Sequence, residues 1–178
     1  PRASRKRKRR PTVPSLLDRI TSVDKLDVTS RRVLVRADLD APLSGDGKVR
    51  DDAKIRAALP TIKRLLERGA RVGVASHLGR PRKGRDAKPS LVSVGERLAD
   101  LLAMEVVLTD EPAGDGARKV VHDLRDGRVA LLENVRQDPG EDANDAEFAR
   151  EMARLCDVYV GDAFAATARA TASVDALP

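Results

Sequence analysis

The sequence predicts an α/β protein: a Rossmann-like parallel sheet with helices on both faces, arranged as three αβα layers. Short apolar runs rich in Val and Ala alternate along the chain with longer segments whose apolar residues follow helical spacing. The apolar runs are nearly continuous, which is typical of strands buried on both faces of a parallel sheet. Neither an internal repeat nor a linker interrupts this pattern after residue 16.

Five apolar runs predict the strands. The clearest is "RRVLVRADL", and "RVGVASHL" follows it after one helical segment. The predicted strands are residues 31–39, 71–78, 104–109, 128–135 and 157–164. The segments between them are long enough for helices, which indicates βαβ units and therefore strands that all run in the same direction.

Four segments between these runs have the spacing of amphipathic helices. In the first, Ile55, Ile62 and Leu65 share one helical face, acidic residues precede them, and Gly69 marks the end. The second helix has Ser90 as its predicted amino-terminal cap. The predicted helices are residues 51–70, 89–103, 117–127 and 144–156.

The positive charge of the chain is concentrated at its beginning. Residues 1–15 contain seven Lys or Arg and no acid, whereas the whole chain has a formal net charge of +6, which leaves −1 for residues 16–178. We therefore expect a basic disordered tail at 1–15 and one domain at 16–178. The tail is either a solvated extension or a weak contact for polyanions such as nucleic acid or an anionic membrane surface.

The composition excludes several classes of protein. Aromatic residues make up only 2% of the chain, so the core must consist of Ala, Val, Leu and Ile. No apolar run approaches the roughly 18 residues that a membrane-spanning helix requires. Cys156 is the only cysteine, which excludes an internal disulfide and fits a reducing cytoplasm. It is either a small packed residue or a reactive thiol.

Polar side chains gather at the ends of three predicted strands. Open α/β sheets bind ligands at the carboxyl ends of their strands, so we expect these side chains to converge on one cleft. They are Arg36, Asp38 and Asp40 after the first strand, His77 and Arg80 after the second, and Glu133, Asn134 and Arg136 after the fourth.

The residue types in this cleft favour a small, multiply charged anion as the ligand. A guanidinium binds phosphate or carboxylate through a planar pair of donors. The expected basic pocket consists of Arg80, Arg136, Arg169, His77 and Lys54. Asp38 and Asp40 would separate the cations and accept from a substrate hydroxyl. A proton-transferring carboxylate pair is the alternative, but the arginines would hold both carboxyls ionised. His122 lies in no motif and is predicted to be structural.

Six segments of the sequence, taken in chain order, carry a resemblance to a known family. They are "RRVLVRADLDAPL", "KIRAALPTIKRLL", "SHLGRP", "LLENVR", "NDAEFAREMARLCDVYVGDAF" and "ARATASV". In this order they resemble the amino-terminal half of phosphoglycerate kinase, from about Val23 to the last residue. The resemblance implies a monomeric cytoplasmic enzyme of glycolysis that transfers a phosphoryl group between 1,3-bisphosphoglycerate and ADP. It also implies Mg²⁺ bound together with ATP or ADP.

The resemblance assigns roles to the residues after the first strand. Asp38, Leu39 and Asp40 lie where the family binds the hydroxyl and carboxyl region of 3-phosphoglycerate. Arg36 matches the first arginine of the motif and would orient neighbouring side chains during catalysis. Lys54 stands where the family usually has an arginine of the binding site.

The remaining site residues come from the later strand ends. The segment that matches the phosphate-binding loop of the family is His77, Leu78, Gly79 and Arg80, with Leu78 and Gly79 shaping the turn. Arg136 and Arg169 match basic residues that hold the phosphate end and the transferred group. With Arg36, the resemblance assigns Arg169 to catalysis.

The sequence also departs from the usual residues of the family. Asp40 replaces an asparagine, "RQD" replaces "RFH" or "RYH", and Ala165, Ala168 and Thr171 replace a glycine and two histidines. These departures support an alternative function, a catalytically silent relative that binds a phosphorylated metabolite or a protein partner. A third possibility makes the basic tail the functional part.

In the family, the amino-terminal domain holds the phosphoglycerate and a separate carboxy-terminal domain holds the nucleotide. No glycine-rich nucleotide loop occurs among these 178 residues. We therefore expect a carboxy-terminal nucleotide domain as a partner. The fragment alone is expected to bind neither Mg²⁺ nor nucleotide and to have no kinase turnover.

Overall fold

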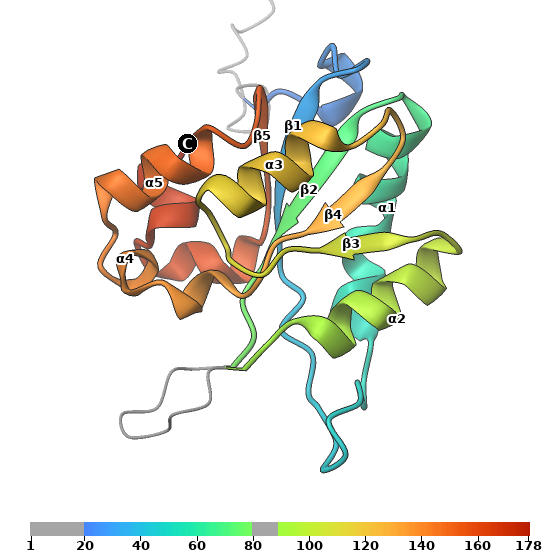
Figure 1. Cartoon of the computed structure of the whole chain (residues 1–178), viewed down its shortest axis with the longest axis vertical. Coiled ribbons are helices and arrows are strands. Elements are labelled where there is room, and N and C mark those ends of the chain that lie inside the picture. The colour runs from blue at the N-terminus through green and yellow to red at the C-terminus, as the bar shows by residue number, and fades with distance from the viewer. Residues whose placement is uncertain (1–19, 80–88) are drawn as a thin grey trace, which may run out of the picture.

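The computed structural model describes residues 20–79 and 89–178, and it confirms the predicted fold class. The sheet of this part of the chain has five parallel strands in the order β3-β4-β2-β1-β5 (Figure 1). The strands are β1 Arg32–Ala37, β2 Arg71–Ala75, β3 Val106–Leu108, β4 Val129–Leu131 and β5 Val158–Asp162. Each of them lies within one of the five predicted runs.

Helices cover both faces of the sheet (Figure 1). They are α1 Ala53–Glu67, α2 Val92–Leu102, α3 Asp115–Asp123, α4 Pro139–Asp142 and α5 Ala146–Ala153. The short α4 was not predicted, and the other four overlap the predicted helices. Single turns of 3₁₀ or π helix occur at Val23–Lys25, Val135–Gln137, Phe164–Ala168 and Ala172–Ala176.

The distribution of the helices follows from the path of the chain. From β1 through β2 to β3 the chain moves towards one side of the sheet, and from β3 through β4 to β5 it moves back. Right-handed crossovers in opposite directions place their helices on opposite faces. Accordingly α1 and α2 pack together in one apolar cluster, and α3 and α5 contribute to the other.

The core is aliphatic, as the composition requires. Val33 and Val35 of β1 point into the cluster under α1 and α2, while Leu34 between them points into the cluster under α3 and α5. This alternation is the ordinary geometry of a strand that is buried on both faces. Ile55 and Ile62 of α1 are completely buried against the first face, which confirms the predicted apolar side of that helix.

The position of β1 in the sheet brings the predicted site residues together. It lies between β2 and β5, and its residue Arg36 is paired in register with Ala75 on one side and Gly161 on the other. The carboxyl ends of these three strands therefore lie side by side. The segments that leave them carry most of the predicted site residues.

Three smaller predictions can be compared with the structure. Leu91, and not Ser90, occupies the capping position of α2. The Ser90 hydroxyl accepts from the Val92 amide at 3.2 Å and donates to Glu133.

Cys156 is half-buried, and burial raises the pKa of its thiol, which favours the packed over the reactive alternative. No helix within residues 20–79 and 89–178 has the length and hydropathy needed to cross a membrane.

Candidate active site at the carboxyl edge of the sheet

A cavity of about 270 Å³ opens at the carboxyl edge of the sheet. Seven predicted residues line it: Arg36, Asp38, Asp40, Lys54, His77, Arg136 and Arg169. They come from the ends of β1, β2, β4 and β5 and from the start of α1. Arg80 lies outside the described residues. The structure thus brings together side chains that are as far apart in the sequence as Arg36 and Arg169.

Arg36 forms the floor of this site. Its side chain is buried, with 2% of the residue exposed. The guanidinium donates from Nε to the Ser173 hydroxyl at 2.7 Å, from Nη1 to the Ala37 carbonyl at 2.7 Å, and from Nη2 to His77 Nδ1 at 3.0 Å. Burial lowers the pKa of Arg36, and the nearby Glu141 carboxylate opposes that effect.

Glu141 is the charged residue of the cavity lining that sequence reasoning missed. It lies on α4 with 1% of its surface exposed, and its Oε1 is 4.0 Å from Arg36 Nη2. The carboxylate accepts from the Thr171 hydroxyl at 2.8 Å and from the hydroxyl and amide of Ser173 at 2.7 and 2.9 Å. A buried carboxylate with three donors and a guanidinium nearby is fully satisfied. The only sequence signal near it is Asp138 before Pro139, which is a common helix start.

His77 requires a correction. It was expected to add positive charge, but burial, with Arg36 and Arg136 nearby, lowers its pKa to about 4. The carboxylates of Asp40 and Asp38 act in the opposite direction and are weaker. His77 is therefore neutral at pH 7, and it contributes hydrogen bonds rather than charge to the site.

Lys54 and Asp38 form an ion pair at the rim of the cavity. The Lys54 ammonium lies 3.1 Å from Asp38 Oδ2, and 4.0 Å from Asp40 Oδ2. The Asp40 amide donates to Asp38 Oδ1 at 3.2 Å, which holds the Asp38 carboxylate towards the lysine. The loop after β1 is tied further by the Leu39 amide, which donates to the Ser76 hydroxyl at 2.9 Å.

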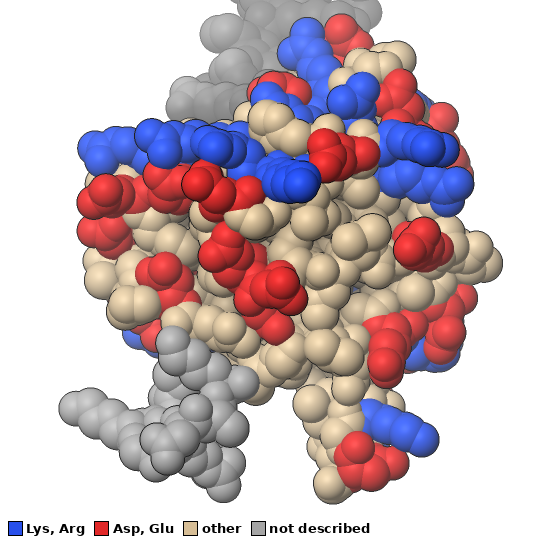
Figure 2. Space-filling view, in the orientation of Figure 1, with Lys and Arg blue, Asp and Glu red and all other residues tan. Residues whose placement is uncertain are grey.

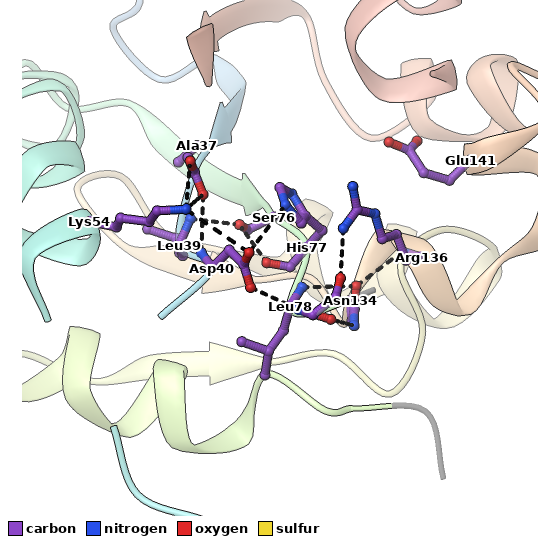
Figure 3. A network of polar contacts seen from close by, with 12 residues as sticks. Ala37, Leu39, Asp40, Lys54, Ser76, His77, Leu78, Asn134, Arg136 and Glu141 are labelled. Carbon is purple, nitrogen blue, oxygen red and sulfur yellow. Dashed lines mark hydrogen bonds and ion pairs between the residues drawn. The ribbon is translucent and has the colours of Figure 1, made fainter. Parts of the chain in front are cut away.

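The turn after β2 is held from both sides (Figure 3). The Gly79 amide donates to Asp40 Oδ1 at 2.8 Å, and the Gly79 carbonyl accepts from Arg136 Nη1 at 2.6 Å. Gly79 has a φ of 66°, the left-handed conformation that glycine adopts at low cost. Leu78 is bonded to the Asn134 side chain through both its amide and its carbonyl, at 3.3 and 3.0 Å. These bonds fix the backbone of Leu78 and Gly79 in this turn.

The segment after β5 closes the cavity. Ala165, Ala168 and Thr171 line it, and Arg169 is the one charged residue that Phe164–Ala168 and the next three residues contribute to its wall. Arg169 is exposed, in contrast to Arg36. Thr171 uses its hydroxyl for Glu141 and does not replace a histidine as a ligand for an anion.

The charges around the cavity are divided between protein partners and a ligand. Asp38 is paired with Lys54, Asp40 caps the Gly79 amide, and Glu141 is bonded to Ser173 and Thr171. Among the described residues, the carboxylate nearest to the Arg136 guanidinium is that of Asp142, 4.0 Å from Nε. Arg136 donates from Nη1 to the Gly79 carbonyl and keeps its other N–H donors for an anion, and the Arg169 side chain has no partner within residues 20–79 and 89–178.

A larger depression of about 590 Å³ lies between the loop at 48–52 and the helix α2. Its lining has four basic and four acidic residues, so their formal charges cancel, and Asp52 binds both Arg56 and Arg97, at 2.8 and 2.7 Å. These pairs are solvated, and they leave no excess of donors for an anion. We therefore assign the site to the smaller cavity.

Comparison with known proteins gives a consistent result. Residues 23–178 match the family model described as phosphoglycerate kinase. The chain is 49% identical over 156 residues to a protein named phosphoglycerate kinase from Anaeromyxobacter dehalogenans, with 86% of this chain and 39% of the relative covered. A relative of the same name from Acaryochloris marina is also 49% identical over 156 residues, covering 88% of this chain and 39% of the relative.

Two solved structures are similar to the fold. Phosphoglycerate kinase from Coxiella burnetii superposes with a TM-score of 0.75 at 40% identity, and covers 86% of this chain and 38% of its own. The kinase from Pyrococcus horikoshii superposes with a TM-score of 0.78 at 29% identity, covering 86% of this chain and 39% of its own. The chain spans about two-fifths of the length of the curated relatives it matches.

Proposed function

Because this chain belongs to the phosphoglycerate kinase family, we propose that it is the phosphoglycerate-binding part of such an enzyme. In this proposal it binds 3-phosphoglycerate or 1,3-bisphosphoglycerate at the carboxyl edge of the sheet. Phosphoryl transfer to or from a nucleotide then takes place when a carboxy-terminal nucleotide domain faces that edge.

One observation carries the proposal: cationic side chains from separate strand ends converge on a single cavity while the nearby carboxylates are occupied by protein partners. Arg136 and Arg169 are left to bind an anion, and Lys54 is half-exposed at the rim. The volume of about 270 Å³ lies near the lower limit of small-molecule sites. A three-carbon acid with one phosphate fits this combination of size and charge.

The proposed roles follow from the contacts of each side chain. Arg136 and Arg169 bind the phosphate end and the transferred group, Arg169 through a planar pair of donors and Arg136 through the donors that its bond to the Gly79 carbonyl leaves. Asp38, held by Lys54, accepts from the substrate hydroxyl. Arg36 lies on the floor and stabilises charge that develops on the reacting carboxylate and phosphoryl group. The acceptor carboxylate is already ionised at pH 7, so no general base is needed.

In this proposal, the carboxy-terminal nucleotide domain binds the nucleotide together with its Mg²⁺ ion. Within residues 20–79 and 89–178, no group of three or more His, Cys, Asp or Glu side chains is placed to hold a metal ion. None of the steps above is therefore assigned to a resident Mg²⁺. In the family the ion accompanies ATP or ADP, which supplies charge neutralisation of the nucleotide phosphates.

The first test is titration calorimetry of the purified chain with 3-phosphoglycerate at low salt. Binding is expected, and Arg136→Ala should weaken it by about tenfold or more, because a charge-assisted hydrogen bond contributes roughly 1.5–3 kcal/mol. Arg128→Ala, an exposed arginine at the opposite edge of the sheet, is the matched control and should bind like the wild type. No heat from the wild type, or equal loss in both variants, would contradict the proposal.

A coupled assay with ATP, Mg²⁺ and 3-phosphoglycerate tests the division of labour between domains. We expect no turnover from the chain alone, because phosphoryl transfer requires both reactants to be held in line. Activity should appear when a nucleotide domain from a relative is supplied. Turnover that co-purifies with the chain alone and disappears in Arg169→Ala would show that the chain holds both substrates.

One observation favours a second candidate, a silent relative that binds a phosphorylated metabolite. Ala165, Ala168 and Thr171 line the wall where the family usually has a glycine and two histidines, so that wall offers fewer donors to the transferred group. Intact binding without turnover, even with a nucleotide domain present, would select this candidate. For either candidate we propose a monomer in the cytoplasm, where Cys156 would remain reduced.

A further inference from the structure

The two histidines of this chain are each in contact with an arginine, but through different ring nitrogens. Arg36 Nη2 lies 3.0 Å from Nδ1 of His77. Arg32 Nη1 contacts Nε2 of His122. Guanidinium nitrogens only donate hydrogen bonds, so the ring nitrogen that faces an arginine must carry a lone pair and not a proton.

The orientation of Arg36 is determined by the groups behind it. Its Nε donates to the Ser173 hydroxyl, and that hydroxyl in turn donates to Glu141 Oε1 at 2.7 Å. The Nη1 group is fixed by the Ala37 carbonyl. With two of its three nitrogens anchored, the planar guanidinium can only aim Nη2 at His77 Nδ1. Glu141 is the one carboxylate within 4.0 Å of Arg36 among the described residues.

We propose that Glu141 is a positioning residue: through the Ser173 hydroxyl and the Arg36 guanidinium, it fixes His77 in the neutral tautomer that carries its proton on Nε2. That N–H lies on the side of Asp40, whose Oδ2 is 3.8 Å away and which also lines the cavity. His77 thus presents a donor, and not a lone pair, to an anionic ligand. This inference rests on the proposed function, but its first test, the tautomer of His77, is measured without a ligand.

The arrangement also explains why a buried acid lines a cavity proposed for an anion. The carboxylate oxygens of Glu141 already accept three hydrogen bonds, from Thr171 and Ser173. The charge of Glu141 compensates the buried Arg36, which would otherwise be an unpaired cation. The low pKa of His77 agrees with this geometry: burial lowers it most, the charges of Arg36 and Arg136 lower it further, and the opposing effects of Asp40 and Asp38 are smaller.

The test is nitrogen NMR of the ¹⁵N-labelled chain at pH 7 without ligand, because an imidazole nitrogen with a proton and one with a lone pair resonate far apart. His77 should show a protonated Nε2 and an unprotonated Nδ1, and His122 the reverse pattern. His122→Gln removes one set of signals and assigns the other. A protonated Nδ1 on His77 would overturn the inference whether or not 3-phosphoglycerate binds.

Glu141→Gln tests the positioning role, because it keeps the size of the side chain and removes its charge. We expect the large difference between the two His77 nitrogen shifts to be lost as the tautomers mix, and 3-phosphoglycerate to bind about tenfold more weakly. Glu147→Gln, the same change at an exposed site on α5, should alter neither measurement. An unchanged His77 pattern in folded Glu141→Gln would overturn the positioning role.

Ser173→Ala serves if Glu141→Gln does not fold. It keeps the carboxylate but removes the hydroxyl that joins Glu141 to Arg36, so the His77 shifts should move in the same direction by a smaller amount. An unmoved His77 pattern would contradict the relay. If His77 has the expected tautomer but the wild type binds no 3-phosphoglycerate, the proposed function fails and the positioning role stands.

Discussion

The two edges of the sheet carry the same three kinds of residue and use them differently. At the carboxyl edge, Arg36 contacts His77, and Glu141 lies behind the arginine. At the amino edge, Arg32 contacts His122 and is paired with Asp157. The first group is buried, with His77 7% exposed, whereas the second group faces solvent.

Burial reverses the electrostatic outcome. At the amino edge, the hydrogen bond that Arg32 donates to Asp157 raises the pKa of Arg32 and lowers the pKa of Asp157 to about 2. At the carboxyl edge, desolvation is the largest effect, and it lowers the pKa of both Arg36 and His77. Residue types alone therefore do not identify a site; what matters is whether water can compensate the charges.

The surface charges of the amino edge support this contrast. Figure 2 shows Lys and Arg gathered along the upper part of the face in view, with Asp and Glu directly beside many of them. Arg71 binds Asp126 at 2.8 Å, and Arg64 binds Asp24 at 2.6 Å. Such exposed pairs contribute little to stability or binding. The amino edge is a solvated surface, whereas the carboxyl edge holds the cavity proposed as the site.

The largest expected effect is the difference in stability between variants that remove Arg36 and Arg32. Arg36→Met leaves the Glu141 carboxylate buried without its cation, which should lower the free energy of unfolding by about 3–5 kcal/mol. Arg32→Met removes a partly exposed pair and should lower it by no more than about 1 kcal/mol. Urea denaturation at pH 7 measures both. Equal losses would remove the basis of the comparison.

The next effect is a pH dependence that belongs to His77. Its pKa is about 4 in the folded chain and 6.5 in an unfolded one, so the unfolded state binds the proton first. The contribution of neutral His77 to the free energy of unfolding should therefore be fully present above pH 6.5. The free energy of unfolding should fall by about 3 kcal/mol as the pH drops from 6.5 to 4. Urea denaturation across this range should show the fall in the wild type but not in His77→Gln.

Asp157→Asn provides the control for this measurement. The pKa of Asp157 is lowered to about 2, so its contribution is present above about pH 4 and is lost only below it. The variant should therefore keep the decrease between pH 6.5 and 4. A decrease that survives in His77→Gln would show that another group titrates there.

A smaller effect is expected from the carboxylates near Gly79 and on the opposite edge. Asp40→Asn keeps an oxygen for the Gly79 amide and removes a negative charge beside the cavity. It should tighten 3-phosphoglycerate binding by up to about tenfold, or about 1.4 kcal/mol. Asp126→Asn at the amino edge should change the affinity little. Weaker binding in Asp40→Asn would show that the carboxylate is needed for the geometry of the turn.

The smallest effect concerns residues 1–15, which lie outside the described part of the chain. Their deletion should leave the melting temperature and the affinity for 3-phosphoglycerate unchanged, because so charged a segment has almost no apolar surface to bury. Binding to a DNA duplex should weaken, with a smaller dependence on salt. A fall of several degrees in melting temperature would instead indicate that these residues pack on the domain.

Much of the fold could be predicted because periodicity is a local property. Ile55, Ile62 and Leu65 repeat at helical spacing, and all three are buried on one face of α1. The ends of the elements were less accurate. Residues 38 and 39 were assigned to the first strand, but β1 ends at Ala37, because the Leu39 amide is bonded to Ser76 and not to a neighbouring strand.

Sequence reasoning found only those residues of the candidate site that lie in recognisable motifs, most of them directly after the end of a predicted strand. Glu141 escaped because it is one of several acids between residues 138 and 147, and no local pattern distinguishes the buried one. The charge of His77 could not be predicted either, because its lowered pKa depends first on burial and then on Arg36, which is 41 positions earlier. Contacts of this kind arise only when separate strand ends meet.

The pairing of β1 with β5 has a consequence for how the protein is made. Arg32 and Asp157, which flank that pairing, are 125 positions apart. During synthesis β1 can pair with β2 early, but its other edge has no partner until β5 has left the ribosome. Such long-range pairing slows folding, and an unpaired strand edge is a point at which chains associate. The strand that bears Arg36 therefore keeps a bare edge until Val158–Asp162 has been synthesised.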